Sequence, residues 1–244
     1  MTNNRTKEYW DKNIKNWGKL YLDISHFNEE LVGPKWLNLL YHLFITPLEA
    51  RLMAERYALT IDFIDQHVHP GTVAADIGCG TGVFTVEMLR RGARVKAIDI
   101  SERSLSITKS LVEQLVPDHA QSVEFFQLDA SLQKLPESDV ALAMGVTPYA
   151  ENLEPFYDNI LPTTRVFYCL TLDPRHWANI IRKLLPMLNV RNMRCFDRQT
   201  VDALLEKHDW RLIERRNFAS GYLDLAVRST QRPTSNTFSS QQNE

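Results

Sequence analysis

The chain has 244 residues, of which 44% are apolar and 24% are charged. This size and composition predict a soluble globular protein with one large domain or one domain plus a cap. The formal net charge of −2 argues against a general nucleic-acid binder. The three cysteines, Cys79, Cys169 and Cys195, are too far apart to predict a disulfide framework or a zinc site, and no segment is apolar enough for a signal peptide or a membrane span. We therefore expect a cytoplasmic protein.

The first 69 residues carry a helical pattern. Apolar residues recur at three- and four-residue spacing in LNLLYHLF and in EARLMAERYALTIDFIDQHV, and no strand signal interrupts them. We predict that residues 1–69 form an N-terminal helical cap.

Residues 70–228 show a different pattern, in which short apolar runs alternate with amphipathic stretches. Such alternation predicts an open, doubly wound α/β sheet whose ligand site lies at the carboxyl ends of the strands. Strands are predicted at residues 72–77, 93–100, 122–129, 139–146, 165–172, 210–218 and 221–229, the last two as an antiparallel hairpin with its turn at 219–221. Helices are predicted at 81–92, 101–116, 151–161, 174–188 and 197–209. Residues 229–244 are polar and aperiodic, which predicts a disordered tail.

A glycine-rich turn, ADIGCGTGVF at residues 75–84, follows the first predicted strand. Glycines at this position let the backbone approach a ligand closely. A dinucleotide-binding turn has the spacing G-x-G-x-x-G, whereas here Val83 stands where its third glycine would fall. Asp76 would also repel a diphosphate and attract a cationic group. The turn therefore predicts a nucleoside ligand with a positive amino group and no phosphates.

Two further acidic residues end the next two predicted strands. Asp99 is placed to accept hydrogen bonds from ribose hydroxyls, a role that fits a dinucleotide and a simple nucleoside equally well. Asp129 is placed to accept a hydrogen bond from an adenine amino group. With Asp76, these residues predict a single groove lined by three acids.

The motifs DIGCGTG, AIDIS and LDA resemble those of the class I S-adenosylmethionine-dependent methyltransferases, and the resemblance extends over roughly residues 72–228. It implies a Rossmann-like sheet of seven strands with helices on both faces, with S-adenosylmethionine as cofactor and S-adenosylhomocysteine as product. It also implies cofactor contacts. These are Asp76, Gly78, Cys79 and Gly80 with the methionine portion, Asp99 and Ile100 with ribose and adenine, Asp129 and Ala130 with adenine, and Met144 and Gly145 closing over the cofactor.

Each of these features has a simpler interpretation as well. Asp76 fits a turn former, Asp99 a helix cap and Asp129 a solvated loop acid. Cys79 fits a small residue of a tight turn better than a reactive thiol. The histidines of residues 67–69 have no third ligand nearby in the sequence, so no metal site is predicted.

The acceptor is predicted to be a small molecule rather than nucleic acid. The segment GVTPYA lacks both the Asn-Pro-Pro-aromatic motif of resembling nucleic-acid methyltransferases and a cysteine for attack on cytosine. Tyr149, His176 and Trp177 are the candidates for the acceptor pocket, with His176 as a base and the two aromatic side chains as a wall; a helix start and its packing face are the alternative for His176 and Trp177. Because alignment alone can drive methyl transfer, no catalytic residue is assigned.

The substrate class is narrowed by a partial similarity. The segments RTKEYWDKN, MLRRGARVKAIDIS and FASGYLDLA are similar to magnesium-protoporphyrin and ubiquinone-pathway O-methyltransferases, although the centre of the chain departs from them. This favours methylation of an oxygen or nitrogen atom of a small molecule, including one of secondary metabolism. The basic stretch at residues 175–198 fits a solvated face or the rim of an anionic-substrate site. A non-catalytic S-adenosylmethionine-binding regulator is the alternative function, and an NAD-dependent oxidoreductase a more distant one.

Overall fold

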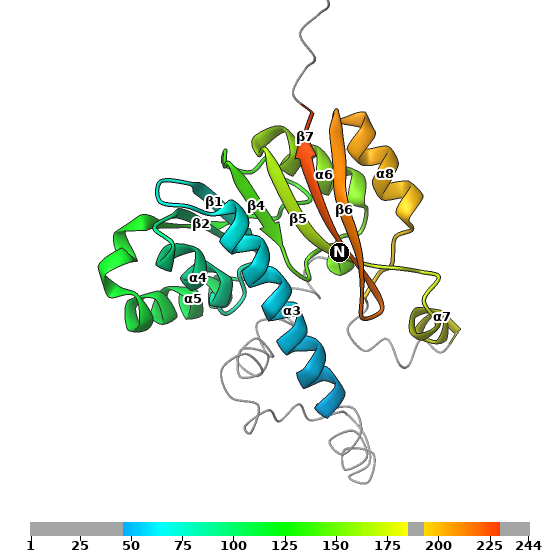
Figure 1. Cartoon of the computed structure of the whole chain (residues 1–244), viewed down its shortest axis with the longest axis horizontal. Coiled ribbons are helices and arrows are strands. Elements are labelled where there is room, and N and C mark those ends of the chain that lie inside the picture. Colours follow the sequence, from blue (N-terminus) through cyan, green and yellow to red (C-terminus); the bar gives the residue numbers. More distant parts are fainter. Residues whose placement is uncertain (1–45, 185–192, 230–244) are drawn as a thin grey trace, which may run out of the picture.

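The computed structural model describes residues 46–184 and 193–229 (Figure 1). The first part of the predicted cap and the predicted tail beyond residue 229 lie outside these ranges. The described chain begins with helix α3 (Thr46–His67), as the apolar spacing of EARLMAERYALTIDFIDQHV predicts. No helix among the described residues is both long enough and apolar enough to cross a bilayer.

The described residues form one seven-stranded sheet with the order β3-β2-β1-β4-β5-β7-β6. The strands are β1 (Val73–Ile77), β2 (Arg94–Asp99), β3 (Val123–Gln127), β4 (Val140–Ala143), β5 (Val166–Leu172), β6 (Trp210–Phe218) and β7 (Gly221–Arg228). The first five are parallel, and β7 runs antiparallel between β5 and β6. The predicted doubly wound sheet and its terminal hairpin are thus confirmed.

Helices cover both faces of the sheet because the central strands are apolar on both sides. The connecting helices are α4 (Val83–Arg90), α5 (Glu102–Leu115), α6 (Leu153–Ile160), α7 (Trp177–Leu184) and α8 (Arg198–Lys207). Alternate strand residues face opposite ways, so that Ala74 and Leu142 pack under α3, α4 and α5, whereas Ala75 and Ala143 pack under α6 and α8. The end of helix α3 therefore packs into the core beneath this face of the sheet.

Several predicted boundaries move inward in the structure. Strand β3 ends at Gln127, so Asp129 lies in the following turn, and β4 ends at Ala143. Helix α7 begins at Trp177 rather than at residue 174, and the predicted residues 185–188 lie outside the described chain. Three short 3₁₀ helices, Pro117–Ser122, Thr147–Tyr149 and Leu161–Thr163, were not predicted; each has a proline at its first or second position, where the missing N–H costs nothing.

The order of strands locates the ligand-binding edge of the sheet. The chain winds outward from β1 to β3 and then returns to place β4 on the other side of β1. Loops that leave the carboxyl ends of β1 and β4 therefore diverge, which opens a crevice at this switch point. The turn of the β6–β7 hairpin, at Ala219 and Ser220, lines the same crevice from the antiparallel end of the sheet.

Candidate functional site

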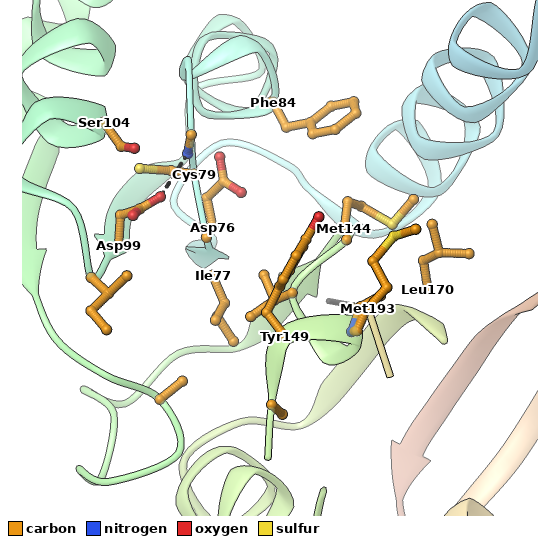
Figure 2. Close-up of a pocket in the computed structure, with 18 of the residues that line it drawn as sticks. Asp76, Ile77, Cys79, Phe84, Asp99, Ser104, Met144, Tyr149, Leu170 and Met193 are labelled. Carbon is orange, nitrogen blue, oxygen red and sulfur yellow. Dashed lines mark hydrogen bonds between the residues drawn. The ribbon is translucent and has the colours of Figure 1, made fainter. Parts of the chain in front are cut away.

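A cavity of about 360 Å³ lies at this edge of the sheet (Figure 2). It is lined by eleven of the thirteen predicted site residues, namely Asp76, Gly78, Cys79, Gly80, Asp99, Ile100, Asp129, Ala130, Met144, Gly145 and Tyr149. His176 and Trp177 do not line it. The structure thus brings together residues that come from four separate loops.

The first part of the glycine turn is held against the end of β2. The backbone N–H groups of Gly78 and Cys79 both donate to the carbonyl of Ile98, at 2.7 and 3.1 Å. Gly78 has a φ of 70°, and a Cβ added to it would lie 2.3 Å from Cγ2 of Val146. Glycine is therefore required here both by the left-handed backbone and by the close approach of the loop after β4.

Gly82, the last glycine of the DIGCGTG turn, is required for packing and does not contact the ligand site. Gly82 does not line the cavity, and a Cβ on it would lie 2.9 Å from the Cα of Thr108 in α5. The Thr108 hydroxyl donates to the carbonyl of Gly80 at 3.1 Å and contacts the Cys79 sulfur at 3.5 Å. Burial raises the pKa of the Cys79 thiol well above its usual value, which agrees with a small packed residue rather than a reactive thiol.

Asp99 joins the turn to the second strand. One carboxylate oxygen accepts a hydrogen bond from the Gly80 N–H at 3.0 Å (Figure 2). The other accepts from the Ser101 N–H at 2.9 Å. The cap of α5 is Ser101, whose hydroxyl accepts from the Ser104 N–H at 3.1 Å. The helix-cap interpretation of Asp99 is therefore replaced by a bridge that fixes the glycine turn.

Asp76 is the most deeply buried acid of the cavity, with 2% of its surface exposed. Its carboxylate accepts a hydrogen bond from the Thr85 hydroxyl at 2.6 Å. Burial raises the pKa of Asp76 to about 6, the Thr85 hydrogen bond lowers it and the charge of Asp99 raises it further. A cationic group beside this carboxylate would offset the cost of burying its charge.

The loop after β3 is also fixed. The Asp129 carboxylate accepts from the Ser131 N–H at 2.9 Å, and the carbonyl of the buried Ala130 accepts from the Asn159 side chain at 3.0 Å. Asn159 belongs to α6, so this loop is tied to the helix layer on one face of the sheet. Asp129 and Ala130 therefore keep a defined position at the cavity.

The other half of the cavity is largely apolar. Figure 2 shows Asp99 on one side, Leu170 and Met193 on the opposite side, and Tyr149 between them. Most of this half was not predicted from the sequence; its lining includes Leu52, Met53, Arg56, Leu170, Leu172, Arg182, Met193, Phe218 and Ser220. These residues come from α3, β5, α7, the segment before α8, the end of β6 and the β6–β7 turn. Because they are far apart in the sequence, no local motif predicts them.

Arg56 brings a positive charge to the boundary between the two halves. A Cβ added to Gly145 would lie 3.4 Å from its guanidinium Nη1. Burial lowers the pKa of Arg56 to about 10, an effect that the neighbouring Tyr149 opposes, and the side chain stays protonated at neutral pH.

His176 and Trp177 take part in the start of α7 instead of the cavity. The Nδ1 atom of His176 accepts a hydrogen bond from the Ala178 N–H at 3.3 Å, and Trp177 is 68% exposed. The prediction of an aromatic wall and a base at these positions is not supported, because their side chains lie outside the cavity lining. Among the described residues, no group of three or more His, Cys, Asp or Glu side chains is arranged to hold a metal ion.

Comparison with known proteins identifies the domain. Residues 75–185 match the family model described as a methyltransferase domain. The matched residues form a class I S-adenosylmethionine-dependent methyltransferase domain. The resemblance, the fold class and the cofactor predicted from the sequence are confirmed, since the matched model describes a methyltransferase domain and solved structures of the same fold hold S-adenosylhomocysteine or S-adenosylmethionine.

Two curated relatives show which methyltransferases the chain is similar to. It is 26% identical over 153 residues to the ubiquinone biosynthesis O-methyltransferase of Hahella chejuensis, a match that covers 57% of this chain and 63% of the relative. It is 40% identical over 79 residues to the magnesium-protoporphyrin O-methyltransferase of Rhodobacter capsulatus, covering 32% of this chain and 34% of the relative. Both matches span less than two thirds of the relative's length.

A solved methyltransferase structure shares the fold over nearly the whole chain. The magnesium protoporphyrin IX methyltransferase of Synechocystis PCC 6803, with bound S-adenosylhomocysteine, superposes with a TM-score of 0.72 at 15% sequence identity. The superposition covers 94% of this chain and 100% of that chain. At this identity the match establishes the methyltransferase fold alone.

Proposed function

We propose that the protein transfers a methyl group from S-adenosylmethionine to an oxygen or nitrogen atom of a small-molecule acceptor. The observation that carries the proposal is the shape of the cavity: a half lined by the glycine turn and three acids is continuous with an apolar half. Direct transfer needs donor and acceptor side by side, and one continuous cavity meets that need. The names of the two O-methyltransferase relatives favour an oxygen over a nitrogen as the atom that is methylated.

The acidic half would hold the cofactor. Asp99 and Ile100 would bind the ribose and adenine, and Asp129 and Ala130 the adenine. A carboxylate has about four acceptor positions, so ribose hydroxyls can bind Asp99 alongside the backbone N–H groups it already accepts. In support, both loops are held by hydrogen bonds of their own and so need little ordering when a ligand binds.

The methionine portion would lie between Asp76 and the 78–80 backbone, with Met144 and Gly145 closing over it. Its amino group is cationic, and Asp76 is a buried carboxylate with a raised pKa, so the two charges suit each other. A diphosphate would suffer repulsion at the same position. The NAD-dependent alternative is disfavoured for this reason.

The remaining residues would align the acceptor and exclude water. When bound, S-adenosylmethionine supplies a sulfonium methyl group that is open to direct displacement. Leu170 and Met193 form an apolar wall beyond Tyr149, and such a wall limits access of water to the reacting atoms (Figure 2). Helix α3 supplies Leu52, Met53 and Arg56 to the cavity, which supports the proposal that residues 1–69 cover the acceptor.

Calorimetric titration with S-adenosylhomocysteine, with NADH in parallel, tests the cofactor assignment. We expect saturable binding of S-adenosylhomocysteine and none of NADH. Asp99→Ala should weaken the binding about ten- to hundredfold, the value of one or two hydrogen bonds to a charged group. Asp118→Ala is the matched control because Asp118 is exposed and lies outside the cavity. Equal affinity in both variants, or binding of NADH alone, would refute the assignment.

Transfer itself requires a second assay, with S-adenosylmethionine labelled in its methyl group and a panel of phenols, amines and carboxylic acids. We expect labelled product with at least one acceptor class. Binding of S-adenosylhomocysteine without transfer to any member of a broad panel would favour the non-catalytic regulator.

A further inference from the structure

We infer that the acceptor carries an anionic group, such as a carboxylate, on an apolar body, and that Arg182 binds this group at the acceptor end of the cavity. The inference rests on the proposed function, because it treats the apolar half of the cavity as the acceptor site. Arg182 is then a specificity-determining residue. It touches the acceptor but takes no part in binding the cofactor.

The charges that line the cavity are separated along the sheet. The three acids that line the cavity, Asp76, Asp99 and Asp129, lie at or just beyond the carboxyl ends of β1, β2 and β3, which are neighbours on one side of the switch point. Arg182 belongs to α7, which Figure 1 shows beside the turn of the β6–β7 hairpin. This hairpin lies on the other side of the switch point. An anionic acceptor would therefore meet an arginine at one end and avoid the acids at the other.

The described cations of the basic stretch, residues 175–198, are of three kinds: some are paired with other groups, some are exposed to solvent, and one lines the cavity. Arg198 pairs with Asp173 at 3.1 Å, and Arg194 donates to the carbonyl of Glu151 at 2.9 Å. Arg175 and Lys183 are exposed to solvent, and Arg191 lies outside the described residues. Of the described cations in this stretch, Arg182 alone lines the cavity. The two interpretations of the stretch thus both apply, to different residues.

Arg182 is held in place by its neighbours. Its Nη1 donates to the side-chain oxygen of Asn179 at 2.6 Å and to the hydroxyl of Ser220 at 3.3 Å. Asn179 is only 3% exposed, and its amide donates at 2.7 Å to the carbonyls of both Asp173 and Ser220. This chain of hydrogen bonds links α7, the end of β5 and the hairpin turn. A guanidinium fixed in this way loses little entropy when it binds a carboxylate.

The surroundings of Arg182 fit an apolar acceptor with one charged group. Leu172, Met193 and Phe218 line the cavity together with Arg182 and come from β5, the segment before α8 and the end of β6. Apolar walls reduce screening by water and so strengthen an ion pair. Arg56 adds a second positive charge to the cavity and so increases its preference for an anion.

Paired probes that differ only in charge test the inference. A panel of flat phenolic acids, with 3-hydroxy-2-naphthoate as its first member, is titrated calorimetrically into the full chain saturated with S-adenosylhomocysteine. Each acid is compared with its own carboxamide. We expect at least one acid to bind about tenfold or more tightly than its amide, the effect of a charge-assisted, bidentate contact. Equal binding of acid and amide, or no acid binding, across the panel overturns the inference.

Variants then assign the preference to Arg182. Arg182→Met should reduce the preference for the acid to within about twofold, and Arg182→Lys should keep only part of it because the planar fork is lost. Lys183→Met removes the same charge from the adjacent exposed position and should keep the full preference. Retention of the preference in Arg182→Met would overturn the assignment.

The affinity for S-adenosylhomocysteine, measured for each variant alone, separates this inference from the proposed function. It should change by less than about twofold in Arg182→Met. If wild-type protein fails to bind S-adenosylhomocysteine, the proposed function fails. If that binding is intact and the acid preference is missing, the inference alone fails.

Discussion

The two halves of the cavity are built in different ways. The acidic half consists of short loops that follow three adjacent parallel strands, and each loop is fixed by its own backbone hydrogen bonds. The other half is assembled from α3, α7, β5 and the β6–β7 turn, which are far apart in the sequence. The first half therefore depends on local geometry and the second on tertiary packing.

This difference has a functional consequence. A ligand common to a whole superfamily can be bound by a fixed set of loops, whereas an acceptor that varies among proteins can be accommodated by side chains on surrounding elements. We expect changes in the acidic half to affect cofactor binding and stability together. Changes in the other half should affect the acceptor alone.

The largest expected effect comes from Gly78→Ala. The new methyl group would overlap Val146 at a backbone φ of 70°, and strain and overpacking together should lower the free energy of unfolding by about 2–5 kcal/mol. Urea unfolding gives this value. Gly71→Ala is the control, because Gly71 has a φ of 89° but nothing within 4 Å of an added Cβ, so it should lose only about 1–2 kcal/mol. Equal losses in the two variants would show that the close approach of the loop after β4 is unimportant.

A smaller effect is expected from the titration of Asp76. Its folded pKa of about 6 exceeds the ordinary value of 3.8, so the folded state binds a proton more tightly than the unfolded state. The resulting contribution to stability is fully present below about pH 4 and is lost as pH rises through 6. A shift of this size corresponds to about 3 kcal/mol. Asp76→Asn should remove this part of the pH dependence, which urea unfolding at a series of pH values between 4 and 8 would measure.

Cofactor binding should have the opposite pH dependence at the same residue. The ionised carboxylate attracts a cationic amino group, so affinity for S-adenosylhomocysteine should rise as pH increases through about 6. Asp76→Asn should flatten this rise while weakening binding at pH 8. If the variant keeps the wild-type pH profile of binding, Asp76 does not face the amino group.

The sequence was sufficient to predict the acidic half because its signals are local. The glycine spacing, Asp76 and Asp99 all lie within 25 residues, from Asp76 to Ile100, and the alternation of apolar runs predicts a parallel sheet whose strand ends bring Asp129 beside them. Even here the packing role of Gly82 was not predicted, because its tight contact is with Thr108 in another helix. Such a contact depends on how α4 and α5 pack, which no local pattern records.

The acceptor half was not predictable in the same way. Arg56 lies in an ordinary amphipathic helix, and Arg182 in a run of similar cations, so neither differs in sequence from a solvated residue. Only the packing of α3 and α7 against the sheet edge distinguishes these two arginines from the solvated residues of the same helices. His176 and Trp177 were chosen because they follow β5, but they lie at the start of α7 and neither lines the cavity.

The smallest expected effect sharpens this contrast. Trp177→Ala removes a large aromatic side chain that the sequence placed in the acceptor pocket and the structure places 68% in solvent. We expect the free energy of unfolding to change by about 0.5 kcal/mol or less, as for other exposed positions. Binding of S-adenosylhomocysteine and of the phenolic acids should change by less than about twofold. A tenfold loss of acid binding in this variant, with cofactor binding unchanged, would mean that Trp177 closes over the acceptor after all, because only a side chain that contacts the acceptor would act on it so selectively.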